Sequence, residues 1–155
     1  MTILDKFVTQ PEPNANLILT GLWLGNYKAA TDLDFLMDNK IDHIINITTD
    51  LPNLFNFISC TQYRIRDSDA CDKNLTAMMD QAVDIIHQKL LCKKNVLVHC
   101  KNGHHRSASV IVYYLIKYYN MHLSDAIIFV KHIRPTTLQR STCLLKHLIQ
   151  HQSLL

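Results

Sequence analysis

The 155-residue sequence is poor in features that mark several classes of protein. It contains 3 glycines and 4 prolines, too few for a collagen-like or low-complexity chain. No apolar run approaches the roughly 18 residues needed to cross a membrane. The opening stretch, MTILDKFVTQPEP, carries charge and proline where a secretory signal requires a long apolar centre. Because 48% of the residues are hydrophobic and 19% are charged, the sequence predicts a globular, non-secreted protein without a membrane span.

Cysteine use and charge indicate the cellular compartment and the kind of ligand. An odd number of cysteines without tight pairing indicates free thiols in a reducing compartment, the cytoplasm or nucleus. The formal charge of +3 is compatible with an anionic ligand, but no basic cluster predicts a stable nucleic-acid partner. Nine histidines are present, yet no CxxC pair or zinc-finger spacing occurs, so no metal and no cofactor are expected. The cysteines are Cys60, Cys71, Cys92, Cys100 and Cys143.

Short β-rich stretches alternate with helical patterns along the chain. This alternation predicts an α/β fold, with a central, mostly parallel sheet flanked by helices. Residues 1–16 are interpreted as an N-terminal arm, and residues 17–155 as one domain. Strands are expected at 17–24 (two strands and a turn), 43–47, 63–66 and 96–98, and helices at 31–39, 74–92, 107–119, 124–134 (capped by Ser124) and 138–151.

The segment His99–Ser107, HCKNGHHRS, carries the chemistry. Cys100 follows the predicted strand at 96–98, and Arg106 opens the next predicted helix. A loop that enters a helix N-terminus presents N–H groups and a positive dipole end, which attract anions. In this field Cys100 is expected to be a nucleophilic thiolate. The planar guanidinium of Arg106 matches two oxygens of a phosphate.

Other residues of the segment have supporting roles. Gly103 allows the backbone to curl around a ligand. Ser107 is placed to donate a hydrogen bond to the Cys100 thiolate, and His99 is expected to support the loop. A nucleophile inside a phosphate cradle indicates phosphoryl transfer through a cysteinyl-phosphate. The residues expected to contact substrate are Lys101, Asn102, Gly103, His104, His105 and Arg106.

These residues resemble a known signature. Residues 96–107, VLVHCKNGHHRS, are similar to the HCxxGxxR[ST] pattern of cysteine-dependent protein phosphatases. The flanking segments resemble the dual-specificity branch, and the resemblance covers residues 17–150. It implies a protein-tyrosine-phosphatase-like fold and hydrolysis of phosphotyrosine and phosphoserine or phosphothreonine in a phosphorylated protein partner. The segments are 22–30, 41–48, 106–116 and 126–135.

The resemblance also implies a general acid on the loop before the long helix. Members of the branch often place an aspartate five residues before an Asn-Leu-[Ser/Thr] helix start, and Asp69 fits this spacing ahead of Asn74. Asp67 is the second candidate. Asp72 is interpreted as a charge at the helix start, which the helix dipole favours.

Three departures from the family pattern leave alternatives open. Lys101 and His104 are basic at positions where lipid- and polyanion-directed relatives carry basic residues, so a phosphoinositide or an RNA 5′-triphosphate is an alternative substrate. His105 replaces a residue that is commonly small. Many members carry Pro-Asn near positions 138–140, where the Asn braces the loop, whereas this chain has Leu-Gln-Arg. A non-catalytic phosphopeptide-binding module is a further alternative, although such relatives lose the cysteine.

Overall fold

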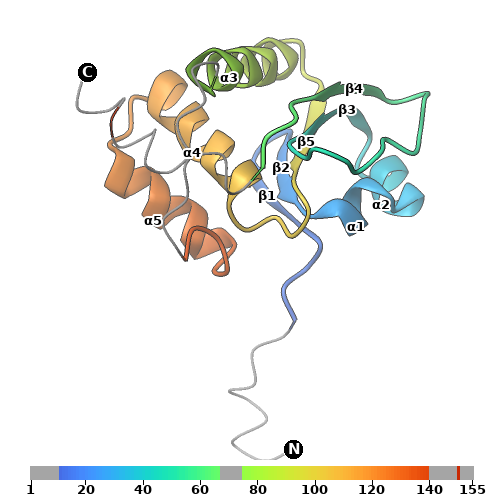
Figure 1. Cartoon of the computed structure of the whole chain (residues 1–155), viewed down its shortest axis with the longest axis horizontal. Helices are drawn as coiled ribbons and strands as arrows, with labels where there is room; N and C mark the ends of the chain where they lie inside the picture. Colours follow the sequence, from blue (N-terminus) through green and yellow to red (C-terminus); the bar gives the residue numbers. More distant parts are fainter. Residues whose placement is uncertain (1–10, 67–74, 140–149, 151–155) are drawn as a thin grey trace, which may run out of the picture.

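A computed structural model describes residues 11–66, 75–139 and 150 of the chain (Figure 1). Strands and helices alternate along the described residues, as the sequence pattern predicts. The elements are β1 (Ala15–Leu19), β2 (Leu22–Gly25), α1 (Tyr27–Ala30), α2 (Leu33–Asp38), β3 (Ile41–Asn46), β4 (Ser59–Gln62), α3 (Leu75–Leu91), β5 (Asn95–His99), α4 (Arg106–Tyr119) and α5 (Leu123–Ile133).

The strands form one sheet in the order β1-β2-β5-β3-β4. Only β1 pairs antiparallel, with β2; the other neighbouring strands are parallel. The central strand β5 is buried from Val96 to His99, which explains why its sequence is an almost continuous apolar run. His99, at its end, lies opposite Gly25 of β2 and Asn46 of β3. This architecture confirms the predicted mostly parallel α/β sheet.

Helices cover both faces of the sheet (Figure 1). Val96 and Val98 pack into the larger core with residues of α3, α4 and α5. Leu97, between them, packs on the opposite face with residues of α1 and α2. This alternation is the two-residue period of a β-strand. Because both faces are covered, the residues that follow β5 emerge at the edge of the sheet where its parallel strands end, which is the usual ligand-binding place in such folds.

Two expectations about individual elements are corrected. No strand spans 63–66; β4 lies at Ser59–Gln62, where it pairs with β3. Its sequence, SCTQ, is polar, so hydrophobic periodicity did not reveal it. Ser59 and Thr61 bond to the ring of His43 in β3, at 2.9 and 3.0 Å. The N-cap of α5 is His122 rather than Ser124, because the helix begins at Leu123 and Ser124 lies inside its first turn.

The helix expected at 138–151 is tested only at its first residues. Leu138 has a φ of 56°, in the left-handed region, so no helix begins there. The rest of the expected helix at 138–151 lies outside the described residues, except Gln150.

At the other end of the chain, β1 begins at Ala15, inside the stretch interpreted as an arm. Among the described residues, no helix is both long and apolar enough to cross a membrane.

Candidate active site

Cys100 lies directly after β5 and is buried, with 3% of its surface exposed. The chain then turns through a loop and enters α4 at Arg106. Ser107, in the first turn of α4, is also buried, and its Oγ lies 3.1 Å from the Cys100 Sγ. The strand, the loop and the helix therefore bring the predicted nucleophile and its predicted hydrogen-bond donor into direct contact.

The carbonyl groups of the loop accept hydrogen bonds from the surrounding protein. The donors come from the residue after β3, from α1, β5 and α4, and from the segment after α5. The bonds run from Ile47 N to His99 O (2.8 Å), His99 Nδ1 to Cys100 O (3.1 Å), Tyr27 N to Lys101 O (3.0 Å), Arg134 Nη2 to Asn102 O (3.3 Å), Arg134 Nε to Gly103 O (3.1 Å), Leu138 N to His104 O (2.7 Å) and Ser109 N to His105 O (2.8 Å).

The N–H groups of the same peptide units point the other way. In a trans peptide the C=O and N–H groups lie on opposite sides, and the structure contains no cis peptide bond among the described residues. Within that part of the chain, the backbone N–H groups of residues 101–104 donate to no protein group. A concave row of such donors binds anions. The loop is therefore built to hold an oxyanion beside Cys100.

Gly103 lies where the loop passes against β2 and Arg134. Its φ is 72°, and a Cβ there would lie 2.7 Å from the Gly25 carbonyl oxygen and 2.9 Å from Arg134 Nη2. Both the backbone conformation and the lack of space require glycine. Gly103 therefore allows this turn of the loop, and its contact with a substrate stays a prediction.

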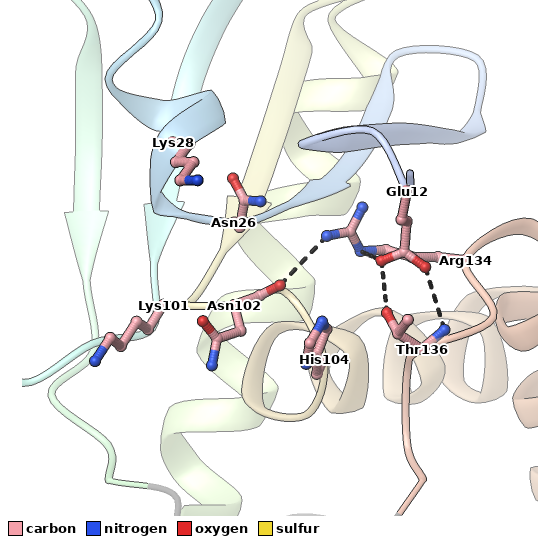
Figure 2. A pocket seen from close by; sticks show the side chains of 8 residues that line it. All are labelled: Glu12, Asn26, Lys28, Lys101, Asn102, His104, Arg134 and Thr136. Atoms are coloured by element: carbon pink, nitrogen blue, oxygen red, sulfur yellow. Dashed lines mark hydrogen bonds and ion pairs between the residues drawn. The ribbon is translucent and has the colours of Figure 1, made fainter. Parts of the chain in front are cut away.

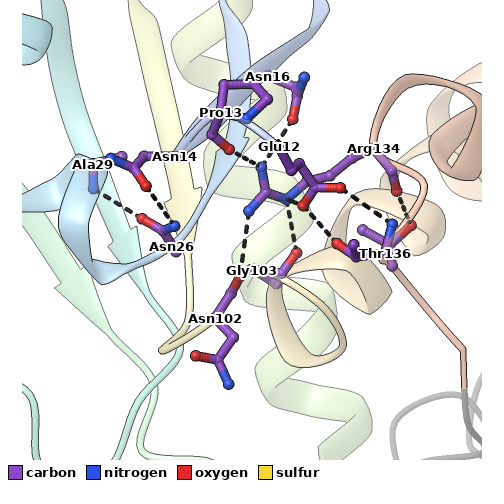
Figure 3. A network of polar contacts seen from close by, with 12 residues as sticks. Glu12, Pro13, Asn14, Asn16, Asn26, Ala29, Asn102, Gly103, Arg134 and Thr136 are labelled. Atoms are coloured by element: carbon purple, nitrogen blue, oxygen red, sulfur yellow. Dashed lines mark hydrogen bonds and ion pairs between the residues drawn. The ribbon is translucent and has the colours of Figure 1, made fainter. Parts of the chain in front are cut away.

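Arg134 braces the loop, and the sequence analysis did not assign it a function. It follows α5, is 1% exposed, and donates to the carbonyls of Asn102 and Gly103 (Figure 3). Burial lowers the pKa of its guanidinium, and the carboxylate of Glu12 opposes that shift. The sequence showed only an arginine before Pro135 at the end of a helix. In this chain the brace of these two loop carbonyls is thus an arginine.

Arg106 lies at the first position of α4, and its Nη1 donates to the Ile65 carbonyl at 3.0 Å. The chain that follows Ile65 leads to the expected general acid. Asp69, Asp67 and Asp72 lie outside the described residues, so their assignment stays a prediction. The bond to Ile65 nevertheless ties the phosphate-binding loop to the stretch of chain that immediately precedes them.

His99 is buried at the end of β5, next to the loop. Burial, with a smaller contribution from the nearby Arg106 charge, lowers its pKa to about 4, and the hydrogen bond to the Cys100 carbonyl opposes the shift. The imidazole is therefore neutral at neutral pH. Its Nδ1 then serves as the donor to the Cys100 carbonyl at 3.1 Å. His99 acts on the backbone of the loop, and its ring also contacts that of Tyr27.

A hollow of about 240 Å³ lies beside the loop (Figure 2). Lys101, Asn102 and His104 line it from the loop, and Lys28 and Asn26 line it from the adjoining turn and α1. Sequence analysis missed the last two, because α1 meets the loop only in the folded chain, where Tyr27 N donates to Lys101 O. Glu12, Arg134 and Thr136 complete the lining. The ring of His105 packs edge-on against that of His104.

The family described as "Dual specificity phosphatase, catalytic domain" matches residues 22–153. The chain belongs to this family. Human dual specificity protein phosphatase 7 is 40% identical over 115 residues, which cover 74% of this chain and 27% of that protein. Human dual specificity protein phosphatase 21 is 36% identical over 118 residues, covering 76% and 62%. The chain thus spans about a quarter of the first relative's length.

Solved structures agree with this assignment. The crystal structure of DUSP15 is 27% identical with a TM-score of 0.82, covering 90% of this chain and 88% of that one. That of human DUSP28 is 21% identical with a TM-score of 0.83, covering 95% and 98%, and it supports the fold alone. The predicted family and the predicted phosphatase-like fold are confirmed. Among the described residues, no group of three His, Cys, Asp or Glu side chains is arranged to hold a metal ion.

Proposed function

We propose that this domain hydrolyses phosphotyrosine, phosphoserine and phosphothreonine in proteins through a cysteinyl-phosphate. One observation carries the proposal: Cys100 Sγ lies 3.1 Å from Ser107 Oγ at a loop whose N–H groups at 101–104 have no protein acceptor among the described residues. The loop places donors around the position of a phosphate and a sulfur nucleophile beside it. The names of the relatives, protein phosphatases of dual specificity, support the substrate class.

The first step transfers the phosphoryl group to sulfur. The Cys100 thiolate attacks phosphorus, an S–P bond forms, and the bond from phosphorus to the leaving oxygen breaks. Loop N–H groups and the Arg106 guanidinium hold the other phosphate oxygens and stabilise their charge in the transition state. Asp69 donates its proton to the leaving oxygen, so that an alcohol or phenol departs. General acid catalysis of this kind typically contributes 10²–10⁴-fold.

The second step releases phosphate. Water attacks phosphorus, the Asp69 carboxylate accepts a proton from that water, and the S–P bond breaks. The electron pair returns to sulfur, and the Ser107 hydroxyl donates a hydrogen bond to the thiolate as it reforms. The cycle consumes one water and needs neither a metal nor a redox step. Because Cys100 must be reduced, we place the protein in the cytoplasm or nucleus.

A panel of substrates tests this function. Turnover is measured in the presence of EDTA on p-nitrophenyl phosphate, phosphotyrosyl and phosphothreonyl peptides, phosphoinositides and a 5′-triphosphate RNA, with Cys100→Ser as the control. We expect turnover of both phosphopeptides, and its loss in the variant. Binding of phosphopeptide without turnover by the reduced, folded protein would instead identify a phosphopeptide-binding module. Turnover that persists in Cys100→Ser would exclude the cysteine mechanism.

The hollow beside the loop favours one second candidate, a polyanionic non-protein substrate. Lys28 and Lys101 line it, and neither side chain has an acidic partner among the described residues. Faster turnover of a phosphoinositide or the RNA than of the phosphopeptides would support this candidate. Lys28→Met would then lower that turnover and leave p-nitrophenyl phosphate unaffected, because the smaller substrate does not reach the hollow.

A further inference from the structure

The guanidinium of Arg134 joins three segments that are distant in the sequence (Figure 3). Toward the loop it donates from Nε to the Gly103 carbonyl, at 3.1 Å, and from Nη2 to the Asn102 carbonyl, at 3.3 Å. Away from the loop, its Nη1 donates to the Pro13 carbonyl at 2.6 Å and to Asn16 Oδ1 at 2.9 Å. All three nitrogens of the guanidinium are therefore engaged with protein acceptors.

Glu12 supplies the charge that this buried cation requires. Its Oε1 lies 3.3 Å from Arg134 Nε, and only 2% of the arginine side chain is exposed. The carboxylate also accepts hydrogen bonds from the Thr136 backbone N, at 3.2 Å, and from the Thr136 hydroxyl. Thr136 lies two residues after Arg134. The carboxylate thus holds both the arginine and the turn that follows it.

The position of Glu12 is unexpected for a residue with this role. It precedes β1, and the match to the family begins ten residues later, at residue 22. The sequence pattern assigned residues 1–16 to an arm outside the catalytic domain. The contacts of residues 12, 13 and 16 with Arg134 instead make this stretch part of the shell around the phosphate-binding loop.

We infer that Arg134 and Glu12 are positioning residues for the phosphate-binding loop, and that the stretch from Glu12 to Asn16 is required for full catalytic rate. The inference rests on the proposed function. The fork of Arg134 fixes two consecutive peptide planes by their carbonyl oxygens. Because the N–H of each plane points to the opposite side, fixing Asn102 O and Gly103 O aims the N–H groups of residues 103 and 104 at the bound oxyanion.

Loss of either partner has a definite consequence. Without the guanidinium, two loop carbonyls and the Glu12 carboxylate lose a donor, and the two peptide planes are free to rotate. Without the carboxylate, a buried cation remains uncompensated, which is strongly unfavourable. Misplacement of a reacting group by about 1 Å can cost 10²-fold in rate. We therefore expect kcat to fall by more than the loss of stability would explain.

The test compares Glu12→Gln and Arg134→Lys with the full wild-type chain, and Asp34→Asn, an exposed acid on α2, is the matched control. Three kinds of measurement are made well below the unfolding temperature: the kinetics (kcat and KM) of p-nitrophenyl phosphate hydrolysis, inhibition by vanadate, and binding of inorganic phosphate by calorimetry. We expect each variant to lower kcat by roughly 10- to 100-fold and to weaken vanadate and phosphate binding. Asp34→Asn should match the wild type.

Arg134→Lys separates positioning from folding. Lysine keeps the charge beside Glu12 but cannot donate to two carbonyls as the planar guanidinium does. We therefore expect Arg134→Lys to keep an unfolding temperature near that of the wild type while its kcat falls. Variants that are less stable but retain wild-type kcat and oxyanion affinity would overturn the inference and leave the proposed function intact. A wild-type chain that neither turns over p-nitrophenyl phosphate nor binds an oxyanion would overturn both.

Discussion

At the residue scale, Cys100 and Ser107 form the contact on which the chemistry depends. Both are buried, and burial of an ionised sulfur is costly unless donors surround it. The Ser107 hydroxyl and the N–H groups of the loop are the donors that the structure provides. An acceptor-rich outer side and a donor-rich inner side therefore make the loop suited to stabilise first a thiolate and then a phosphate.

Ser107→Ala should slow the release of phosphate from sulfur. A hydrogen bond to a charged group contributes about 1.5–3 kcal/mol, so kcat should fall roughly 10- to 100-fold while the affinity for vanadate changes little. Rapid-quench experiments should show that the phosphoenzyme accumulates. Ser107→Thr retains the hydroxyl and should retain most of the rate. Unchanged kcat in Ser107→Ala would contradict a role for this hydroxyl in the chemistry.

The general acid is the second prediction at this scale. Asp69→Asn should lower turnover mainly for substrates with poor leaving groups, because these require a proton as the bond to phosphorus breaks. The measurement compares aryl phosphates whose phenols differ in acidity, for Asp69→Asn and Asp67→Asn side by side. If only Asp67→Asn steepens the dependence on the leaving group, the acid is Asp67 and the assignment to Asp69 is wrong.

At the scale of elements, the strand, loop and helix around Cys100 were predictable because their signals are local. An apolar run precedes the cysteine, and one glycine, one arginine and an apolar helix follow within twenty residues. The brace was not predictable in this way, because Arg134 lies 31 residues from Gly103 and 118 from Asn16. Strand β4 was missed for a related reason, since its polar side chains bond to His43 of the neighbouring strand.

Gly103→Ala tests the loop as an element. Its φ of 72° disfavours alanine, and the new Cβ would lie 2.7 Å from the Gly25 carbonyl oxygen, so overpacking should cost about 1–3 kcal/mol of unfolding free energy. The matched control is Gly21→Ala, which has a similar φ of 83° but lies in the turn between β1 and β2.

Both glycine variants should lower the midpoint of urea unfolding. Only Gly103→Ala should also weaken vanadate binding, because only this residue belongs to the phosphate-binding loop. Equal loss of vanadate affinity in the two variants would indicate a general effect of backbone strain. Wild-type affinity in Gly103→Ala would show that the loop tolerates a side chain where it passes against β2.

At the scale of the whole molecule, buried neutral histidines connect stability to pH. Burial, with a smaller contribution from the Lys89 charge, lowers the pKa of His43 to about 4. His99 is lowered to about 4 for the same main reason. In the unfolded chain both rings regain an ordinary pKa near 6.5. As the pH falls below about 6.5, the unfolded state binds protons that the folded state does not, so stability is lost.

Urea unfolding between pH 7.5 and pH 5 measures this loss. Each histidine should contribute up to about 1.4 kcal/mol per pH unit over the lower part of that range. His43→Gln should remove roughly half of the combined slope, because glutamine has no proton to gain. A free energy of unfolding that stays constant down to pH 5 in the wild type would mean that the two rings are not buried as neutral groups.

The identity of the residue that carries the phosphoryl group tests the central claim most directly. A rapid-quench reaction with a phosphotyrosyl peptide is stopped in acid, digested and mapped by mass spectrometry. We predict one added phosphoryl group on the peptide that contains Cys100, absent from Cys100→Ser, which should also have lost turnover. A phosphoryl group on another residue, or turnover that continues in Cys100→Ser, would contradict a mechanism through Cys100.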